Sequence, residues 1–226
     1  MNLYTKGTLD GNLIELFKKE RYEPFVLDIM NASNNVFPHN YKHVVHQSNG
    51  ECDFLSSEGE KFDAKLPFNQ EQMMLLARGK NHDKNPQIYK WLKELQDEAS
   101  EFSEYISKRG NFDISTTKLY QIMQAEILKN NQKSTDENIV FFIPYTIVLS
   151  VPGSMFLQFT TDFLSAIYSK LKEQIDLKNC DIYAIWPSIE KNVFAVRNLK
   201  NHNTEFIMND SISSYITYET SAEKLW

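Results

Sequence analysis

The residues with the clearest chemical potential are two aspartates that stand on either side of a turn. Asp53 and Asp63 are separated by nine residues, and Gly59 lies between them. Because glycine readily adopts the left-handed conformation that a tight turn needs, this segment is predicted to form a β-hairpin. Antiparallel pairing of Phe54 with Phe62 then sets Asp53 directly opposite Asp63.

The chemistry that this hairpin favours is metal-dependent hydrolysis. Two carboxylates directly across a strand pair repel each other, so a cation between Asp53 and Asp63 would stabilise the hairpin. The two carboxylates and the backbone carbonyl of Ala64 suit a hard divalent ion such as Mg²⁺ or Mn²⁺. Side chains alternate along a strand, so Lys65 faces the same side as Asp63 and could orient or deprotonate an attacking water. The alternative is a hairpin with solvated acids and a cross-strand ion pair.

The same residues resemble a known motif. Asp53, a nine-residue spacer and the Asp-Ala-Lys triplet of residues 63–65 are similar to the core motif of the PD-(D/E)xK nuclease superfamily, which includes many restriction endonucleases. Apolar residues flank the triplet, as in that family. Cys52 precedes the first aspartate in place of proline, at a position that varies in the family. The triplet is short, and residues 176–178 repeat its pattern elsewhere in the chain.

The resemblance implies Mg²⁺ or Mn²⁺ as the cofactor, and it implies further site residues outside the hairpin. Many family members supply an extra acid from the first core helix, a role that Glu20 would take here. The alternative for Glu20 is an ion pair with a neighbouring lysine or a solvent-facing position. Some members carry a glutamine shortly after the triplet, where Gln70 and Gln72 stand. The basic residues that we expect to bind phosphates, with a solvated loop as the alternative, are Arg78, Lys80 and Lys84.

Two other chemistries are disfavoured by the pattern. His39, His43 and His46 are close in sequence and suggest zinc, but a strand would point His43 and His46 to opposite faces. Cys52 stands beside an inward-facing strand residue, where cysteine is more often a small core residue than a nucleophile.

Several helices and strands must position these residues. A helix over residues 10–22 has an apolar stripe that includes Glu20, and Pro24 is predicted to interrupt it before a second apolar piece at residues 25–30. A strand over residues 41–47 precedes the hairpin of residues 52–66. Further helices are predicted near residues 69–76, 86–108, 115–130 and 155–174, and a linker at 130–138. Residues 139–151 are predicted to form a buried strand pair or one long strand bent at Pro144. Further strands are predicted over 181–186, 192–198, 205–208 and 215–218.

This order of elements predicts an α/β protein. Helix, three strands, helices and strand is the order that the resemblance leads us to expect for a restriction-endonuclease-like core, with a mixed central β-sheet flanked by helices. We expect a single domain over residues 1–226. Its core would cover about residues 10–151, and a C-terminal α/β extension with extra strands would cover about residues 152–226.

Composition narrows the class of protein. The chain has 226 residues, of which 42% are hydrophobic, which is enough for a substantial core. The formal net charge of −6 argues against a protein that coats nucleic acid through bulk electrostatics. Two cysteines are too few for a disulfide framework. The first residues are polar and lack the apolar segment of a signal peptide, and the longest apolar run is too short to span a bilayer. We therefore expect a soluble, cytoplasmic protein with no membrane contact.

The predicted function is that of a metal-dependent nuclease that hydrolyses phosphodiester bonds of DNA or RNA, as the effector subunit of a prokaryotic restriction or anti-phage defence complex. The acidic charge favours a protein partner or an oligomer for targeting. We expect Asp63→Ala to abolish cleavage and to leave thermal stability unchanged or raised, because repulsion is relieved. The alternative function is a non-catalytic interaction or adaptor subunit with a degenerate nuclease-like fold.

Overall fold

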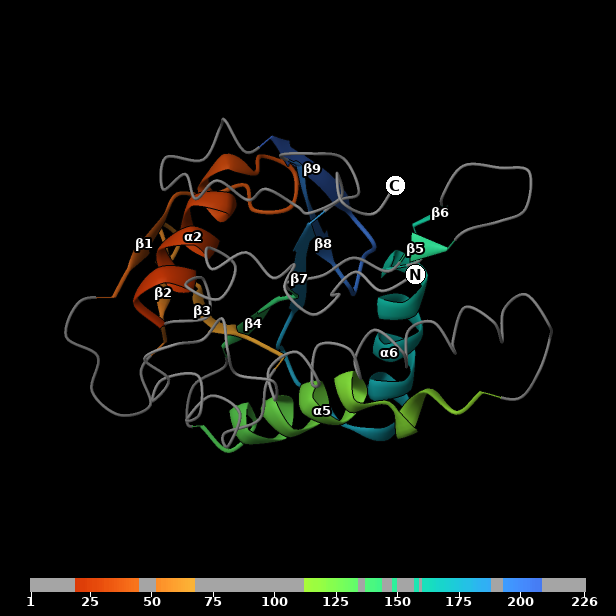
Figure 1. The fold of residues 1–226 in the computed structure, drawn as a ribbon. Helices are drawn as coiled ribbons and strands as arrows, with labels where there is room; N and C mark the ends of the chain where they lie inside the picture. Colours follow the sequence, from red (N-terminus) through yellow and green to blue (C-terminus); the bar gives the residue numbers. More distant parts are fainter. Residues whose placement is uncertain are drawn as a thin grey trace, which may run out of the picture.

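The computed structural model describes residues 19–44, 52–67, 112–133, 137–143, 148–149, 157–158, 160–187 and 193–208. These residues form an α/β fold with a seven-stranded sheet (Figure 1). The described helices are α2 (Lys19–Ala32), the 3₁₀ turn η2 (Ile114–Thr116), α5 (Lys118–Asn130) and α6 (Thr160–Gln174). The strands are β1 (Tyr41–His43), β2 (Phe54–Ser56), β3 (Lys61–Lys65), β4 (Asn138–Phe142), β5 (Val148–Leu149), β6 (Leu157–Gln158), β7 (Ile182–Pro187), β8 (Val193–Asn198) and β9 (Thr204–Met208). Within these ranges, no helix combines the length and apolar character needed to cross a membrane.

The main sheet is mixed and has the strand order β1-β2-β3-β4-β7-β8-β9. β1, β2 and β3 form an antiparallel meander, and β7, β8 and β9 form a second one. Between them, β3 pairs with β4 and β4 with β7 in parallel. Parallel neighbours need a crossover connection, and α5 and α6 occupy these two connections.

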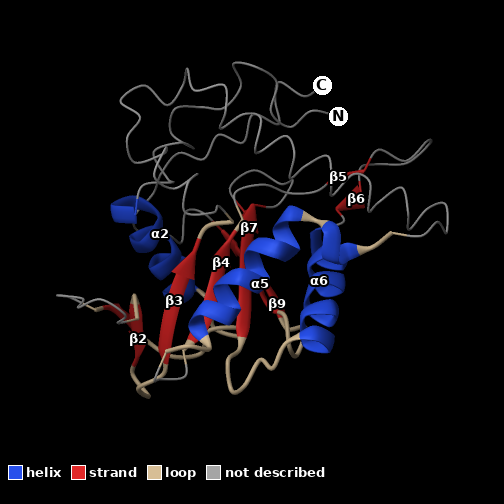
Figure 2. Ribbon diagram, turned by 90° about the horizontal axis from the view of Figure 1, so that it is seen from below, coloured by secondary structure: helices blue, strands red, loops and turns tan. Residues whose placement is uncertain are grey.

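Helices cover both faces of this sheet, which gives two hydrophobic cores. Alternation along β4 sends Val140 and Phe142 into the core under α2, whereas Ile139 and Phe141 pack against α5 and α6. Figure 2 shows α5 and α6 lying along the sheet, with α2 at its other side. The polar residues of β3 described below lie on the face that α5 and α6 cover.

Helix α2 differs from the prediction because it continues through Pro24. A proline inside a helix removes one backbone hydrogen bond and crowds the preceding turn. Here Phe25, Val26 and Ile29 are fully buried in the core beneath the helix, and their packing holds the helix together on the far side of the proline. Packing therefore overrides the local signal for a break.

The apolar run from residue 139 onward also differs from the prediction. Its first part is the central strand β4, whereas Val148–Leu149 pairs with Leu157–Gln158 in a separate two-stranded sheet. The predicted C-terminal strands within the described residues, β7, β8 and β9, extend the main sheet and do not form a sheet of their own. The predicted strand at residues 215–218 and the predicted helices at 69–76 and 86–108 lie outside the described residues.

The edge strand β9 is tied to the loop after α2 by one carboxylate. Glu205 accepts hydrogen bonds from the Ser33 hydroxyl at 2.5 Å and from the amides of Asn34, Asn35 and Val36 at 3.1, 2.9 and 3.3 Å. Burial opposes ionisation, but these donors lower the pKa of Glu205. The carboxylate therefore fixes the C-terminal end of α2 against the far edge of the sheet.

Glu205→Ala is expected to lower the free energy of unfolding by about 2 kcal/mol, because charge-assisted hydrogen bonds to backbone amides are lost together. Urea denaturation at neutral pH measures the change. Glu173→Ala is the matched control, since this exposed side chain on α6 makes only a 3.4 Å ion pair with Lys170 among the described contacts. Equal losses for the two variants would show that Glu205 does not anchor the loop.

Candidate active site

The β2–β3 hairpin has the predicted turn and register. Gly59 has φ +87°, and its amide donates to the Ser56 carbonyl at 3.1 Å. Phe54 pairs with Phe62 across the strands, as predicted. Because the turn fixes the register of both strands, it also fixes where the two aspartates lie.

Asp53 is held in place by its own backbone. It stands one residue before β2, donates its amide to the Phe62 carbonyl at 2.9 Å, and accepts from the Val44 amide at 3.0 Å. Its side-chain Oδ2 accepts from the Ala64 amide at 2.8 Å. The side chain is only 3% exposed. These bonds aim the carboxyl group at β3, beside Asp63.

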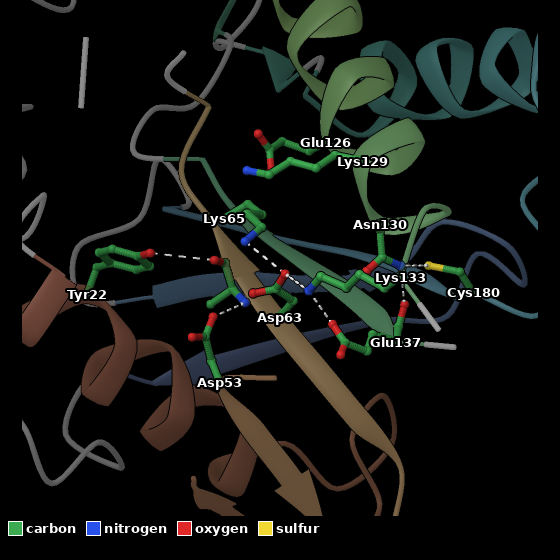
Figure 3. Close-up of polar contacts among 11 residues, drawn as sticks. Tyr22, Asp53, Asp63, Lys65, Glu126, Lys129, Asn130, Lys133, Glu137 and Cys180 are labelled. Carbon is green, nitrogen blue, oxygen red and sulfur yellow. Dashed lines mark hydrogen bonds and ion pairs between the residues drawn. The ribbon is translucent and has the colours of Figure 1, made fainter. Parts of the chain in front are cut away.

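Asp63 lies on β3 at the centre of the cluster (Figure 3). Its Oδ2 forms ion pairs with Lys65 Nζ at 2.8 Å and with Lys133 Nζ at 2.9 Å. Phe62 and Ala64 face the opposite core, as alternation predicts. The structure thus brings Asp53, Asp63 and Lys65 together, and it adds a second lysine.

The two aspartates have opposite pKa shifts because they hydrogen-bond to each other in a buried place. Burial, the Asp63 carboxylate and the charge of Glu23 raise the pKa of Asp53 from 3.8 to about 7, against the opposing effect of the Ala64 amide. Burial also acts to raise the pKa of Asp63, but Lys65, Asp53 and Lys133 together lower it to about 2. Near neutral pH Asp63 is therefore ionised, whereas Asp53 is partly protonated and is the acid of the pair that takes up the proton.

Lys133 reaches the cluster from the loop that follows α5. Besides Asp63, its ammonium group pairs with Glu137, whose side chain is 1% exposed. Asn130 at the end of α5 donates to the Glu137 carbonyl at 2.8 Å, and the Lys133 amide donates to the Asn130 carbonyl at 2.9 Å. Burial opposes the charge of Lys133, yet the hydrogen bonds that it donates to Glu137 and Asp63 raise its pKa. Lys133 therefore stays protonated.

Helix α2 supplies a buried acid near the pair, one turn beyond the predicted one. Glu20 lies in the first turn of α2, and the structure does not describe its side chain. Glu23 is 3% exposed, and its Oε2 lies 3.0 Å from His43 Nε2. Its charge contributes to the raised pKa of Asp53. Among the described side chains, Glu23 is thus the acid of α2 whose charge acts on Asp53.

The donor set fits a divalent cation of the Mg²⁺ type. Two adjacent carboxylates that share a proton mark a place where positive charge is stabilised, and the Ala64 carbonyl lies on the same strand. Mg²⁺ is commonly held by one or two carboxylates, with waters and substrate phosphates completing its shell. Tyr22 donates to the Ala64 carbonyl at a long 3.5 Å. No group of three or more His, Cys, Asp and Glu side chains suited to a metal occurs in the described ranges.

Other predicted residues fall outside the described ranges. They are Gln70, Gln72, Arg78, Lys80 and Lys84. Of the histidines, His43 pairs with Glu23, and His39 lies 4.0 Å from Glu60, so the two do not converge. Cys52 is buried, and burial raises the pKa of its thiol, which disfavours a nucleophile.

A polar cavity of about 400 Å³ lies apart from the aspartate pair. It is lined by Gly59, Glu60, Lys61, Asn138, Asn179, Asp181 and Lys200. Its Asp181 and Lys200 neutralise each other through a 2.7 Å ion pair. The cavity lining includes neither Asp53 nor Asp63.

Sequence reasoning missed Lys133, Glu137 and Glu23. Lys133 and Glu137 fall in the segment that was predicted to be a linker, and their link to the site depends on the parallel pairing of β3 with β4. The available signal was Glu137 itself, an acid directly before an apolar strand. Comparisons of this chain with protein-family models, with curated proteins and with solved structures each found no match.

Proposed function

We propose that this chain is a metal-dependent nuclease that hydrolyses phosphodiester bonds of DNA or RNA. The observation that carries the proposal is the convergence of Asp53, Asp63 and Lys65 on one buried point. The order of α2, the three strands β1 to β3, α5 and β4 also agrees with the restriction-endonuclease-like core that the motif resembles. A bound Mg²⁺ or Mn²⁺ would polarise the phosphoryl group and lower the pKa of an attacking water.

The charges of the cluster support this function. Asp63 and Glu137 are balanced by Lys65 and Lys133, while the pKa of Asp53, about 7, leaves this acid only partly ionised near neutral pH. A divalent cation that displaces the Asp53 proton would add positive charge beside the single negative charge of a bound phosphodiester. In this role Lys65, adjacent to Asp63, stabilises the negative charge that develops on the phosphate.

The proposed setting is a prokaryotic defence complex in which a partner supplies targeting, since a net charge of −6 gives weak general affinity for phosphate backbones. The function is tested by incubating metal-stripped protein with labelled DNA and RNA, with Mg²⁺, Mn²⁺ or EDTA. Both the isolated chain and the assembly recovered from its host are used. Cleavage is expected only with metal, and absence of cleavage in both preparations would overturn the proposal.

A second candidate is a non-catalytic adaptor. The observation that favours it is the completeness of the ion-pair network, because Asp63 and Glu137 already have lysine partners without a metal. Such a network can serve as structure alone. This candidate predicts neither cleavage nor Mn²⁺ binding, so the same assay separates the two functions.

A further inference from the structure

Lys133 occupies an unusual place for a loop lysine. Its ammonium nitrogen lies between two acids, 2.9 Å from Asp63 Oδ2 on β3 and in contact with Glu137, which directly precedes β4 (Figure 3). An ammonium group has three donors, and these two contacts use two of them. One donor is thus left for a ligand, as far as the described contacts show.

The two partners of this ion pair differ in access. The Lys133 side chain is 21% exposed, whereas that of Glu137 is 1% exposed. Glu137 is held further by its neighbour Asn130, which binds its carbonyl. A ligand at the cluster can therefore touch Lys133 but not Glu137, whose contact fixes the direction of the lysine.

We propose that Lys133 binds a backbone phosphate of the nucleic acid and that Glu137 is its positioning residue. The proposal rests on the proposed function, and it extends the site beyond the motif of residues 53–65. When Asp63 is engaged by a divalent cation, Lys133 keeps its contact with Glu137 and donates to a non-bridging phosphate oxygen. A charged lysine placed in this way neutralises one phosphate charge without reading the base.

This arrangement gives Lys133 opposite effects on two ligands. Its ammonium competes with a cation for Asp63, so Lys133→Gln is expected to tighten Mn²⁺ binding about fivefold. The same change is expected to weaken binding of short labelled DNA and RNA about tenfold, because a charge-assisted contact is lost. A residue with only a structural role would weaken both.

The variants are chosen to separate position from charge. Lys133→Gln removes the lysine partner of the buried Glu137, so the double variant Lys133→Gln/Glu137→Gln, which removes both charges, guards against misfolding. Glu137→Gln alone leaves Lys133 on Asp63 and is expected to weaken Mn²⁺ binding. Lys133→Arg retains the charge and is expected to restore most nucleic-acid binding. Lys170→Gln on α6 is the control, since the ion pair described for this lysine is with Glu173.

Mn²⁺ affinity is measured by electron paramagnetic resonance, and nucleic-acid affinity by fluorescence anisotropy in Ca²⁺. Tighter Mn²⁺ binding with weaker DNA or RNA binding in Lys133→Gln or the double variant supports the proposal. Unchanged or equally weakened affinities for both ligands overturn it, while wild-type cleavage leaves the nuclease function intact. Wild-type protein that neither binds Mn²⁺ nor cleaves refutes the nuclease function, and the role of Lys133 falls with it.

Discussion

Asp63→Asn is expected to reduce metal-dependent cleavage of DNA or RNA by about 10³-fold or more. Asp63 is the residue on which the site converges, since it contacts Lys65, Lys133 and the Asp53 carboxyl group. Asparagine keeps the size of the side chain but supplies no negative charge to hold a cation or orient either lysine. Initial rates with labelled substrates in Mn²⁺ measure the effect, with circular dichroism as the check on folding.

The chain offers a matched control for this variant. Asp176 belongs to the second Asp-Leu-Lys triplet, where it is exposed and accepts from the Lys178 amide at 2.9 Å. Asp176→Asn makes the same chemical change in the same short motif, away from any paired acid, and is expected to leave the rate unchanged. Full cleavage by Asp63→Asn would remove this site as the catalyst.

Asp53→Asn is expected to stabilise the metal-free protein at neutral pH and above. The pKa of Asp53 is about 7 in the folded chain and takes its ordinary value of 3.8 when unfolded. Between about pH 4 and pH 7 the folded chain thus binds more protons, and the free energy of unfolding falls as the pH rises. Asparagine keeps the neutral hydrogen bonds, so we expect a gain of about 2 kcal/mol above pH 7, allowing for relaxation and screening.

Asp63→Asn is expected to change stability in the opposite direction. The pKa of Asp63 is lowered to about 2, so its contribution to stability is present above about pH 4 and is lost as the pH falls toward 2. Removing it leaves Lys65 and Lys133 without their common partner. The expectation that removing Asp63 raises stability by relieving repulsion is therefore revised. A gain in the free energy of unfolding is instead expected when Asp53 is replaced.

Urea denaturation in EDTA from about pH 4 to pH 8 tests both expectations, a higher free energy of unfolding for Asp53→Asn and a lower one for Asp63→Asn. The difference between Asp53→Asn and wild type should grow with pH through the titration of Asp53. A constant difference across this range would show that Asp53 does not hold the shared proton.

The hairpin could be predicted from sequence because its determinants are local. Gly59 specifies the turn, and the alternation of residues 61–65 separates the buried face from the polar face. Those two features are enough to place Asp53 beside Asp63. The strands β7 and β8 were predicted for a similar reason, since short apolar runs bounded by polar residues indicate buried strands.

The rest of the site depends on contacts between distant parts of the chain. Lys133 is 70 residues from Asp63 in sequence, and it reaches the site only because β4 pairs with β3 in parallel. Glu23 was not predicted for another reason. The helix was predicted to end at residue 22, before Pro24, whereas the continuous helix carries Glu23 inward.

The most direct test of the metal site is anomalous diffraction from crystals soaked in Mn²⁺. We expect one peak between the carboxylates of Asp53 and Asp63, beside the Ala64 carbonyl, with Lys133 retaining its contact to Glu137. The peak should be absent from Asp63→Asn crystals treated in the same way. Wild-type crystals that show no peak there, with Lys65 and Lys133 still paired to Asp63, would contradict the central claim.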